Sequence, residues 1–306
     1  MYLFLRNDRP SSRLRYLFSG LLAILLSVTS CDLINQAETA PAYLRIASLN
    51  LSTSANQGSA SGKISEAWVF LDNELLGAFA IPSTIPVLAE GPHEIRIEAG
   101  IRENGISSTP DIYPFYQAHT ETVDFTALET VEVNAQISYQ NQTRFSLIEA
   151  FEGGASIFRQ VITGTPNSKL EISKTDAFEG NGKGIIQLAS NDPFVEIATS
   201  TRYRGLLDNS TAVFLELNYR SDVAASFGIV GYLDSQELPI GTAYQAGFNP
   251  SSEWNKIYFN LTPIVFNSNV DALQIVIKAG LPINQEGTFE QESGLVELDN
   301  IKLVHF

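Results

Sequence analysis

The chain offers few residues for catalysis or metal binding. It contains one cysteine, Cys31, and three histidines, His93, His119 and His305. A single cysteine excludes both a disulfide framework and a thiolate zinc site. Neither a G-x-S-x-G elbow nor an H-E-x-x-H helix occurs. Two carboxylates are enough for a glycosidase, but no pair stands out among the 34 Asp and Glu residues. We therefore predict that the chain is not an enzyme, and a glycan hydrolase stays as an alternative.

Aromatic side chains beside polar ones are the other chemistry that the sequence contains. Sugar rings bind by stacking on aromatic rings and by hydrogen bonds to polar neighbours. Arg202 and Arg204 flank Tyr203, and Tyr232 and Tyr244 lie in loop-like or strand-end segments. We predict that these five residues form a contact surface for a ligand. The alternative reading of each aromatic residue is a place in a hydrophobic core.

Residues 1–30 have the composition of a targeting segment. Four arginines lie between residues 6 and 15, and an apolar stretch follows from residue 16 to residue 28. That stretch is too short to cross a bilayer of about 30 Å comfortably. The tetrapeptide Val28-Thr29-Ser30-Cys31 closes the segment. It resembles the lipobox of bacterial lipoproteins, in which an aliphatic residue and two small residues precede a lipidated cysteine.

The lipobox resemblance implies that the signal is removed before Cys31 and that Cys31 carries acyl chains. Several acyl chains make a lasting membrane anchor. The implied location is the cell envelope of a Gram-negative bacterium, at the outer membrane, with the periplasmic or surface face left open. The processed chain would have 15 Lys and Arg against 33 Asp and Glu. Such an acidic body repels anionic membranes, so we expect bilayer contact through the lipid alone.

Beyond residues 31–42, which we interpret as a lipidated tether, the pattern favours an all-β protein of two β-sandwich domains. Short apolar runs alternate with polar residues, and no window carries a helical apolar stripe. A length of 306 residues suits two domains. A polar segment near residues 139–145 places the boundary, giving domains over 43–142 and 143–306. The net charge of -15 argues against nucleic acid as a partner.

The first predicted domain contains a segment of strands separated by turn residues. Asp72-Asn73-Glu74 predicts a hairpin turn between two apolar strands. The segment 68–100, with its polar turn, two prolines and a Gly-Pro before an alternating strand, resembles PEGA-type and related Ig-like β-sandwich modules. This resemblance implies an envelope module without catalytic activity.

The second predicted domain has about eight strands, which suits a two-sheet jelly roll. Its opening Phe151-Glu152-Gly153, its segment 177–184 and its closing 298–301 resemble the galactose-binding-like jelly rolls that include many carbohydrate-binding modules. The resemblance implies a structural calcium ion held by Glu152, Asn181 and Asp299. The alternative is that Asp299 caps a strand and Glu152 is solvated.

Taken together, these patterns predict a lipid-anchored envelope protein that binds a ligand without catalysis through its jelly roll. A glycan is the leading ligand class. The alternative is a structural or scaffolding subunit that contacts other outer-membrane proteins.

Overall fold

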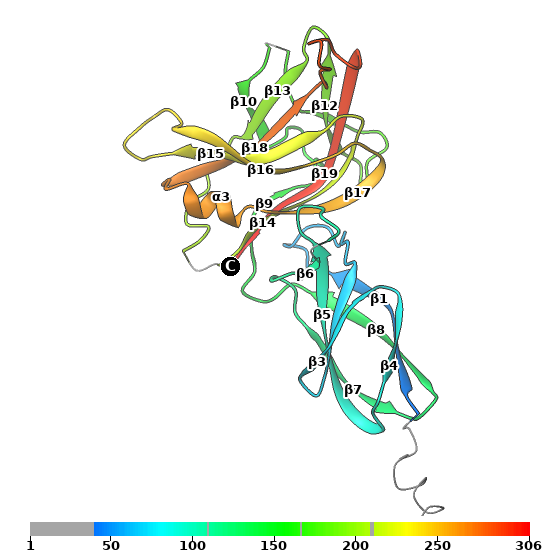
Figure 1. The fold of residues 1–306 in the computed structure, drawn as a ribbon. Coiled ribbons are helices and arrows are strands. Elements are labelled where there is room, and N and C mark those ends of the chain that lie inside the picture. Colours follow the sequence, from blue (N-terminus) through cyan, green and yellow to red (C-terminus); the bar gives the residue numbers. More distant parts are fainter. Residues whose placement is uncertain (1–39, 109, 166, 209–210) are drawn as a thin grey trace, which may run out of the picture.

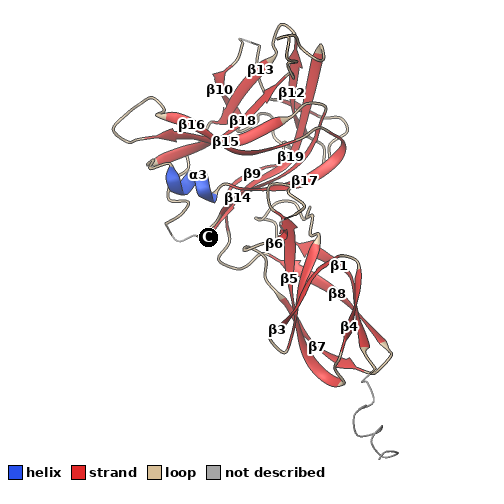
Figure 2. Cartoon of the chain, viewed as in Figure 1, coloured by secondary structure: helices blue, strands red, loops and turns tan. Residues whose placement is uncertain are grey.

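The computed structural model describes residues 40–306 except 109, 166 and 209–210. Strands dominate this part of the chain, and it holds one short helix, α3 (Thr262–Asn267) (Figure 2). The prediction of an all-β protein is confirmed. Among the described residues, no helix is long and apolar enough to cross a membrane. Cys31 and the segment before it lie outside the described residues.

The strands up to residue 138 form two facing sheets. One has the order β4-β1-β8, and in it β1 and β8 run parallel. The other has the order β3-β2-β5-β6, with β7 also paired to β5. We call these sheets the first unit. Its strands are β1 (Ala42–Ser52), β2 (Glu66–Leu71), β3 (Glu74–Ala80), β4 (Ser83–Val87), β5 (Gly91–Arg102), β6 (Pro110–Ile112), β7 (His119–Phe125) and β8 (Thr130–Ser138).

The remaining strands form a second sandwich, which we call the second unit. Its five-stranded sheet has the order β10-β13-β18-β15-β16, and its six-stranded sheet has the order β11-β12-β19-β14-β17 with β9 paired to β19. The strands are β9 (Arg144–Glu149), β10 (Phe158–Thr163), β11 (Glu171–Ser173), β12 (Lys183–Ala189), β13 (Phe194–Thr199), β14 (Val213–Ser221), β15 (Ala225–Tyr232), β16 (Gly241–Phe248), β17 (Ser251–Asn260), β18 (Ala272–Gly280) and β19 (Ser293–His305).

The predicted hairpin turn between β2 and β3 is present. Asp72 and Asn73 have φ angles of 48° and 70°, and Leu71 pairs with Glu74 across the turn. Two successive residues with positive φ form the two-residue turn whose twist matches that of the flanking strands. Asp72 also accepts a hydrogen bond from the backbone N–H of Glu94 at 3.0 Å, which fixes the turn to β5.

The two units meet end to end, as Figure 1 shows, through a buried aromatic and polar contact. The ring of Tyr113 lies 5.0 Å from that of Tyr258 and 5.3 Å from that of Phe214, both in the second unit. The hydroxyl of Tyr113 donates to Glu216 at 2.7 Å, and that of Tyr139 donates to the same carboxylate at 2.8 Å. Because Glu216 is fully buried, these donors replace the water that its charge would otherwise need.

Lysine side chains complete this contact. Lys302 Nζ donates to the carbonyl of Ser59 at 2.6 Å, and Lys256 Nζ lies 3.4 Å from Glu216. Burial lowers the pKa of Lys302 to about 8. The hydrophobic core of the first unit also continues into Phe214 and Tyr258 of the second. The contact between the units is therefore packed like a protein interior.

Candidate functional site

The outer face of the six-stranded sheet carries the functional candidates. In β14, Leu215, Leu217 and Tyr219 belong to the hydrophobic core, so Glu216, Asn218 and Arg220 point to the opposite face. The neighbouring strands alternate in the same way. The polar and aromatic members of this outer face are Lys183, Gln187, Glu216, Asn218, Arg220, Trp254, Lys256, Tyr258, Glu297, Asp299 and Lys302.

The end of the outer face away from the first unit is hollowed. A cavity of about 610 Å³ lies there, in the size range of ligand pockets. Glu171, Gln187 and Asp222 line it with side chains that accept or donate hydrogen bonds, and Leu295 is part of its wall. Asp222 is positioned by two contacts to Leu295: its carboxylate accepts from the backbone N–H at 2.6 Å, and its own N–H donates to the carbonyl at 3.2 Å.

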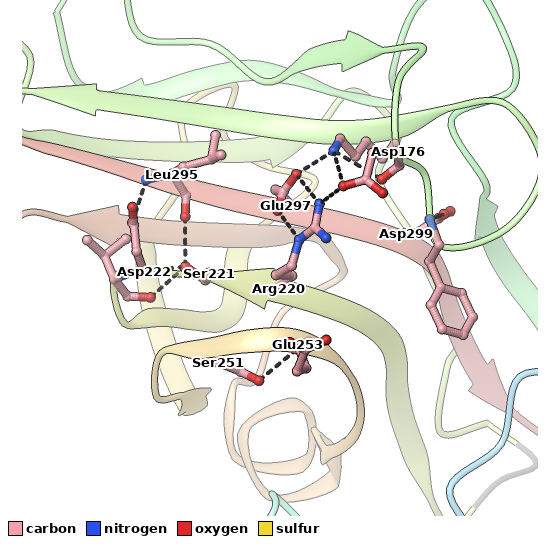
Figure 3. A network of polar contacts seen from close by, with 12 residues as sticks. Asp176, Arg220, Ser221, Asp222, Ser251, Glu253, Leu295, Glu297 and Asp299 are labelled. Carbon is pink, nitrogen blue, oxygen red and sulfur yellow. Dashed lines mark hydrogen bonds and ion pairs between the residues drawn. The ribbon is translucent and has the colours of Figure 1, made fainter.

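A network of charged side chains continues from this cavity along the sheet (Figure 3). The guanidinium of Arg220 binds both oxygens of Glu297, and it also donates to Asp176 at 2.5 Å. Lys183 binds Glu297 as well and donates to the carbonyl of Asp176 at 3.1 Å. This network connects Arg220 of β14 with Asp176, which lies between β11 and β12, through Glu297 of β19.

The electrostatics of this network suit binding better than proton transfer. Hydrogen bonds to Glu297 and Asp176 raise the pKa of Arg220. The hydrogen bond from Arg220 lowers the pKa of Asp176. Burial opposes ionisation of Glu297, but hydrogen bonds from Arg220 and Lys183 lower its pKa overall. Both carboxylates are therefore ionised and paired near neutral pH, which makes each a poor general acid.

Two aromatic rings border the network. Trp254 and Phe178 meet edge to face with centroids 5.7 Å apart, and the guanidinium carbon of Arg220 lies 5.0 Å from the centre of the Trp254 ring. The indole N–H of Trp254 is buried and has no hydrogen-bond partner among the described residues, and the same holds for the side-chain oxygen of Asn218.

The five residues predicted as a contact surface lie elsewhere, around the five-stranded sheet. Tyr203 and Tyr232 are only 6% and 2% exposed, so neither offers a free ring to a sugar. The guanidinium of Arg202 covers the Tyr232 ring at 3.6 Å, and Arg204 is paired with Asp234 at 2.6 Å. These side chains are therefore buried or paired within the protein, and their role as a contact surface stays a prediction.

Tyr244, the last of that set, lies partly buried on the same sheet. Its hydroxyl donates to Glu196 at 2.5 Å, and Lys278 Nζ lies 5.0 Å from its ring centre. The structure therefore gives Tyr244 partners within the sheet, and it does not bring it together with Tyr203 at a single cavity.

The residues predicted to hold calcium lie around the loop that joins β11 and β12. Both oxygens of Asp299 accept backbone N–H groups, from Phe178 at 3.1 Å, Glu179 at 3.2 Å and Asn300 at 2.8 Å. Glu152 accepts the N–H groups of Asn181 at 2.7 Å and Gly182 at 3.0 Å. These N–H groups stabilise the negative charge of each carboxylate directly. A calcium ion would instead need six to eight oxygen ligands around it.

Backbone N–H groups therefore bind these carboxylates, where a calcium ion would need further oxygen ligands beside them. Among the described residues, no group of three or more His, Cys, Asp or Glu side chains is placed to bind a metal ion. The calcium ion itself stays a prediction from the sequence.

Nothing in the sequence singled out Arg220, Glu297, Lys183 or the lining of the cavity as functional residues. The available signal was the alternation of charged residues with apolar ones inside the strands that became β14 and β19. Such alternation marks a sheet face that is polar rather than packed on a core. It does not show which of these charges meet.

No family model matches the chain, and no curated protein matches it. Solved structures similar to it include a carbohydrate-binding module of the β-sandwich superfamily, at 12% identity over 88% of this chain and 99% of that chain, with a TM-score of 0.38. Another is the CBM22-1 xylan-binding domain from Paenibacillus barcinonensis, at 12% identity over 53% and 94% of the two chains, with a TM-score of 0.34. A third is a family 30 carbohydrate-binding module from Clostridium thermocellum, at 10% identity over 48% and 94%, with a TM-score of 0.34. Because these TM-scores are below 0.5, we derive no ligand and no binding residue from them.

Proposed function

We propose that the chain is a noncatalytic glycan-binding protein that is held at the cell envelope by a lipid on Cys31. The observation that carries glycan binding is the hollow of about 610 Å³ on the outer face, lined by both hydrogen-bond donors and acceptors. Sugars present hydroxyl groups that need both kinds of partner. The aromatic rings of Trp254 and Phe178 lie beyond the Arg220 network.

The place where β1 begins supports the proposed lipid anchor on Cys31. β1 begins at the end of the first unit that lies opposite to the contact with the second unit (Figure 1). A lipid at Cys31 would therefore leave the hollow turned away from the membrane, where it is open to a ligand. Tethering would also raise the local concentration of binding sites at the envelope.

A glycan array probed with the detergent-solubilised lipoprotein tests the binding function. Trp254→Ala should weaken binding about tenfold, which corresponds to about 1.4 kcal/mol. Gln187→Ala, which removes an exposed group from the cavity, should weaken it by a smaller factor. Trp68→Ala is the matched control, because Trp68 lies in β2 of the first unit. Equal melting temperatures would establish that the variants are folded.

Three outcomes would oppose the proposal. Binding that Trp254→Ala and Gln187→Ala leave unchanged would place the site elsewhere. No glycan binding, together with co-purification of an outer-membrane protein, would favour the scaffolding role. Release of sugars from the array would favour a hydrolase.

The anchor is tested separately by replacing its sulfur. Cys31→Ser should abolish acylation and move the protein from the detergent phase to the aqueous phase in a Triton X-114 partition. Ser30→Ala is the control, because a small residue before the cysteine is kept. An unchanged partition and mass in Cys31→Ser would refute the anchor.

A further inference from the structure

The chain enters the first unit between two loops. β1 is the middle strand of its sheet, with β4 on one side and β8 on the other. Ala42 pairs with Val87, the last residue of β4. On the other side, the N–H of Leu128 donates to the carbonyl of Pro41 at 2.9 Å. The β4–β5 loop and the β7–β8 turn therefore lie on either side of Pro41.

Each of these loops exposes a leucine. Leu88, directly after β4, is 74% exposed, and Leu128, in the β7–β8 turn, is 70% exposed. Adjacent strands lie about 4.8 Å apart, so the backbones of the two loops are separated by about 10 Å across β1. We call Leu88 and Leu128 the leucine tip. It surrounds the point where the chain arrives from Cys31.

The backbone of Leu128 makes its exposure more notable. Glu129 N–H donates to the carbonyl of Thr126 at 3.1 Å, which closes a four-residue turn, and Leu128 has a φ of 67° in it. Glycine or asparagine is the usual residue at the third position of such a turn. Leu128 gains little burial that would offset its left-handed conformation. Neither local conformation nor core packing accounts for a leucine here.

The length of chain beyond the described residues identifies the surface that the tip can meet. Ten peptide units join Cys31 to Pro41. At about 3.4 Å for each residue, they span at most about 34 Å, whatever their conformation. A lipid on Cys31 would therefore keep the leucine tip close to the bilayer.

We propose that the leucine tip inserts into the interfacial region of the bilayer that holds the lipid of Cys31. This inference rests on the proposed anchor and adds a second, protein-mediated contact to it. The tip is flanked by the exposed carboxylates Glu90 and Glu129. Because these charges are repelled by anionic lipids, the contact favours a zwitterionic surface.

Fluorophores attached to single cysteines test the contact in the lipidated protein. Cys31 is the only cysteine, and its thiol is occupied in the lipoprotein, so Leu88→Cys or Leu128→Cys can be labelled alone with an environment-sensitive NBD dye. The control is Leu238→Cys in the second unit, where the leucine is 76% exposed. The proteins are reconstituted in vesicles of phosphatidylcholine and phosphatidylethanolamine.

The dye at positions 88 and 128 should shift its emission to the blue and be quenched by shallow doxyl-labelled lipids, whereas the dye at position 238 should show neither effect. Leu128→Asn in the Leu88→Cys protein should weaken the shift and leave the melting temperature unchanged or higher, because asparagine tolerates the turn.

The failure of this inference differs from the failure of the anchor. A protein that floats with the vesicles while all three dyes are equally exposed to water would overturn the leucine tip alone. A protein that does not associate with the vesicles, and whose Cys31 is unmodified by mass, would refute the anchor and the tip with it.

Discussion

The hydroxyl of Tyr113 provides a direct test of how the two units are held together. It donates to Glu216 at 2.7 Å, and both side chains are fully buried. Burial raises the pKa of Tyr113 well above its usual value, so the hydroxyl keeps its proton at any ordinary pH. A hydrogen bond to a charged group contributes about 1.5–3 kcal/mol. We expect Tyr113→Phe to lower the free energy of unfolding by about 2 kcal/mol.

The size of this effect follows from what stays in place. After the change, Glu216 still accepts from Tyr139 at 2.8 Å and 2.9 Å and still faces Lys256 at 3.4 Å. The carboxylate of Glu216 therefore loses one hydrogen bond and keeps its other partners. Glu216→Leu removes the charge itself. It leaves Lys256 without its ion-pair partner and the hydroxyls of Tyr113 and Tyr139 without their acceptor, so it should cost more, about 3–5 kcal/mol.

Urea unfolding followed by tryptophan fluorescence and by far-UV circular dichroism measures both changes. Tyr43→Phe is the matched control, because it removes the same atom from a half-buried ring whose hydroxyl makes no hydrogen bond to the described residues. If Tyr113→Phe stays within about 0.5 kcal/mol of the control, the contact with Glu216 does not stabilise the fold and the reasoning is refuted.

Three further predictions concern pH, metal and turn geometry. Burial raises the pKa of Asp299 from 3.8 to about 6, so the native state binds a proton more tightly than the unfolded state, and the free energy of unfolding should fall as the pH rises from 4 through 6. In urea unfolding across that window Asp299→Asn should lack this fall, and the same pH dependence in both proteins would contradict the prediction. EDTA should leave the melting temperature unchanged, because N–H groups bind both oxygens of Asp299 and one oxygen of Glu152. A lowered melting temperature would support the calcium ion. Asn73→Gly should change stability by less than about 0.5 kcal/mol, whereas Asn73→Val should cost about 1–2 kcal/mol at a φ of 70°, both measured by thermal unfolding.

Local patterns in the sequence predicted the strands and one turn well. Alternation identified β7 and β8, and Asp72-Asn73 identified the hairpin, because both features depend on neighbours within a few residues. α3 was missed, because its six residues are too few to show a helical period.

The candidate site depends on long-range contacts that no local pattern contains. Asp176, Arg220, Trp254 and Glu297 come from four segments that only the sheet order brings together. The surroundings of Tyr232, which the sequence predicted as part of a contact surface, depend on a long-range contact in the same way. Its ring is covered by Arg202 from a distant loop, which the sequence around either residue does not reveal.

One strand, β5, runs the full length of the first unit. It starts at Gly91, which pairs with Phe125 just before the β7–β8 turn, and it ends at Arg102, next to the contact of Asn104 with Tyr258 in the second unit. Twelve residues at about 3.3 Å each span about 40 Å. The length of β5 therefore sets the distance between the second unit and the point of chain entry. Each pair of residues added to this strand and its partners would lift the outer face by about 7 Å without altering a single group on it.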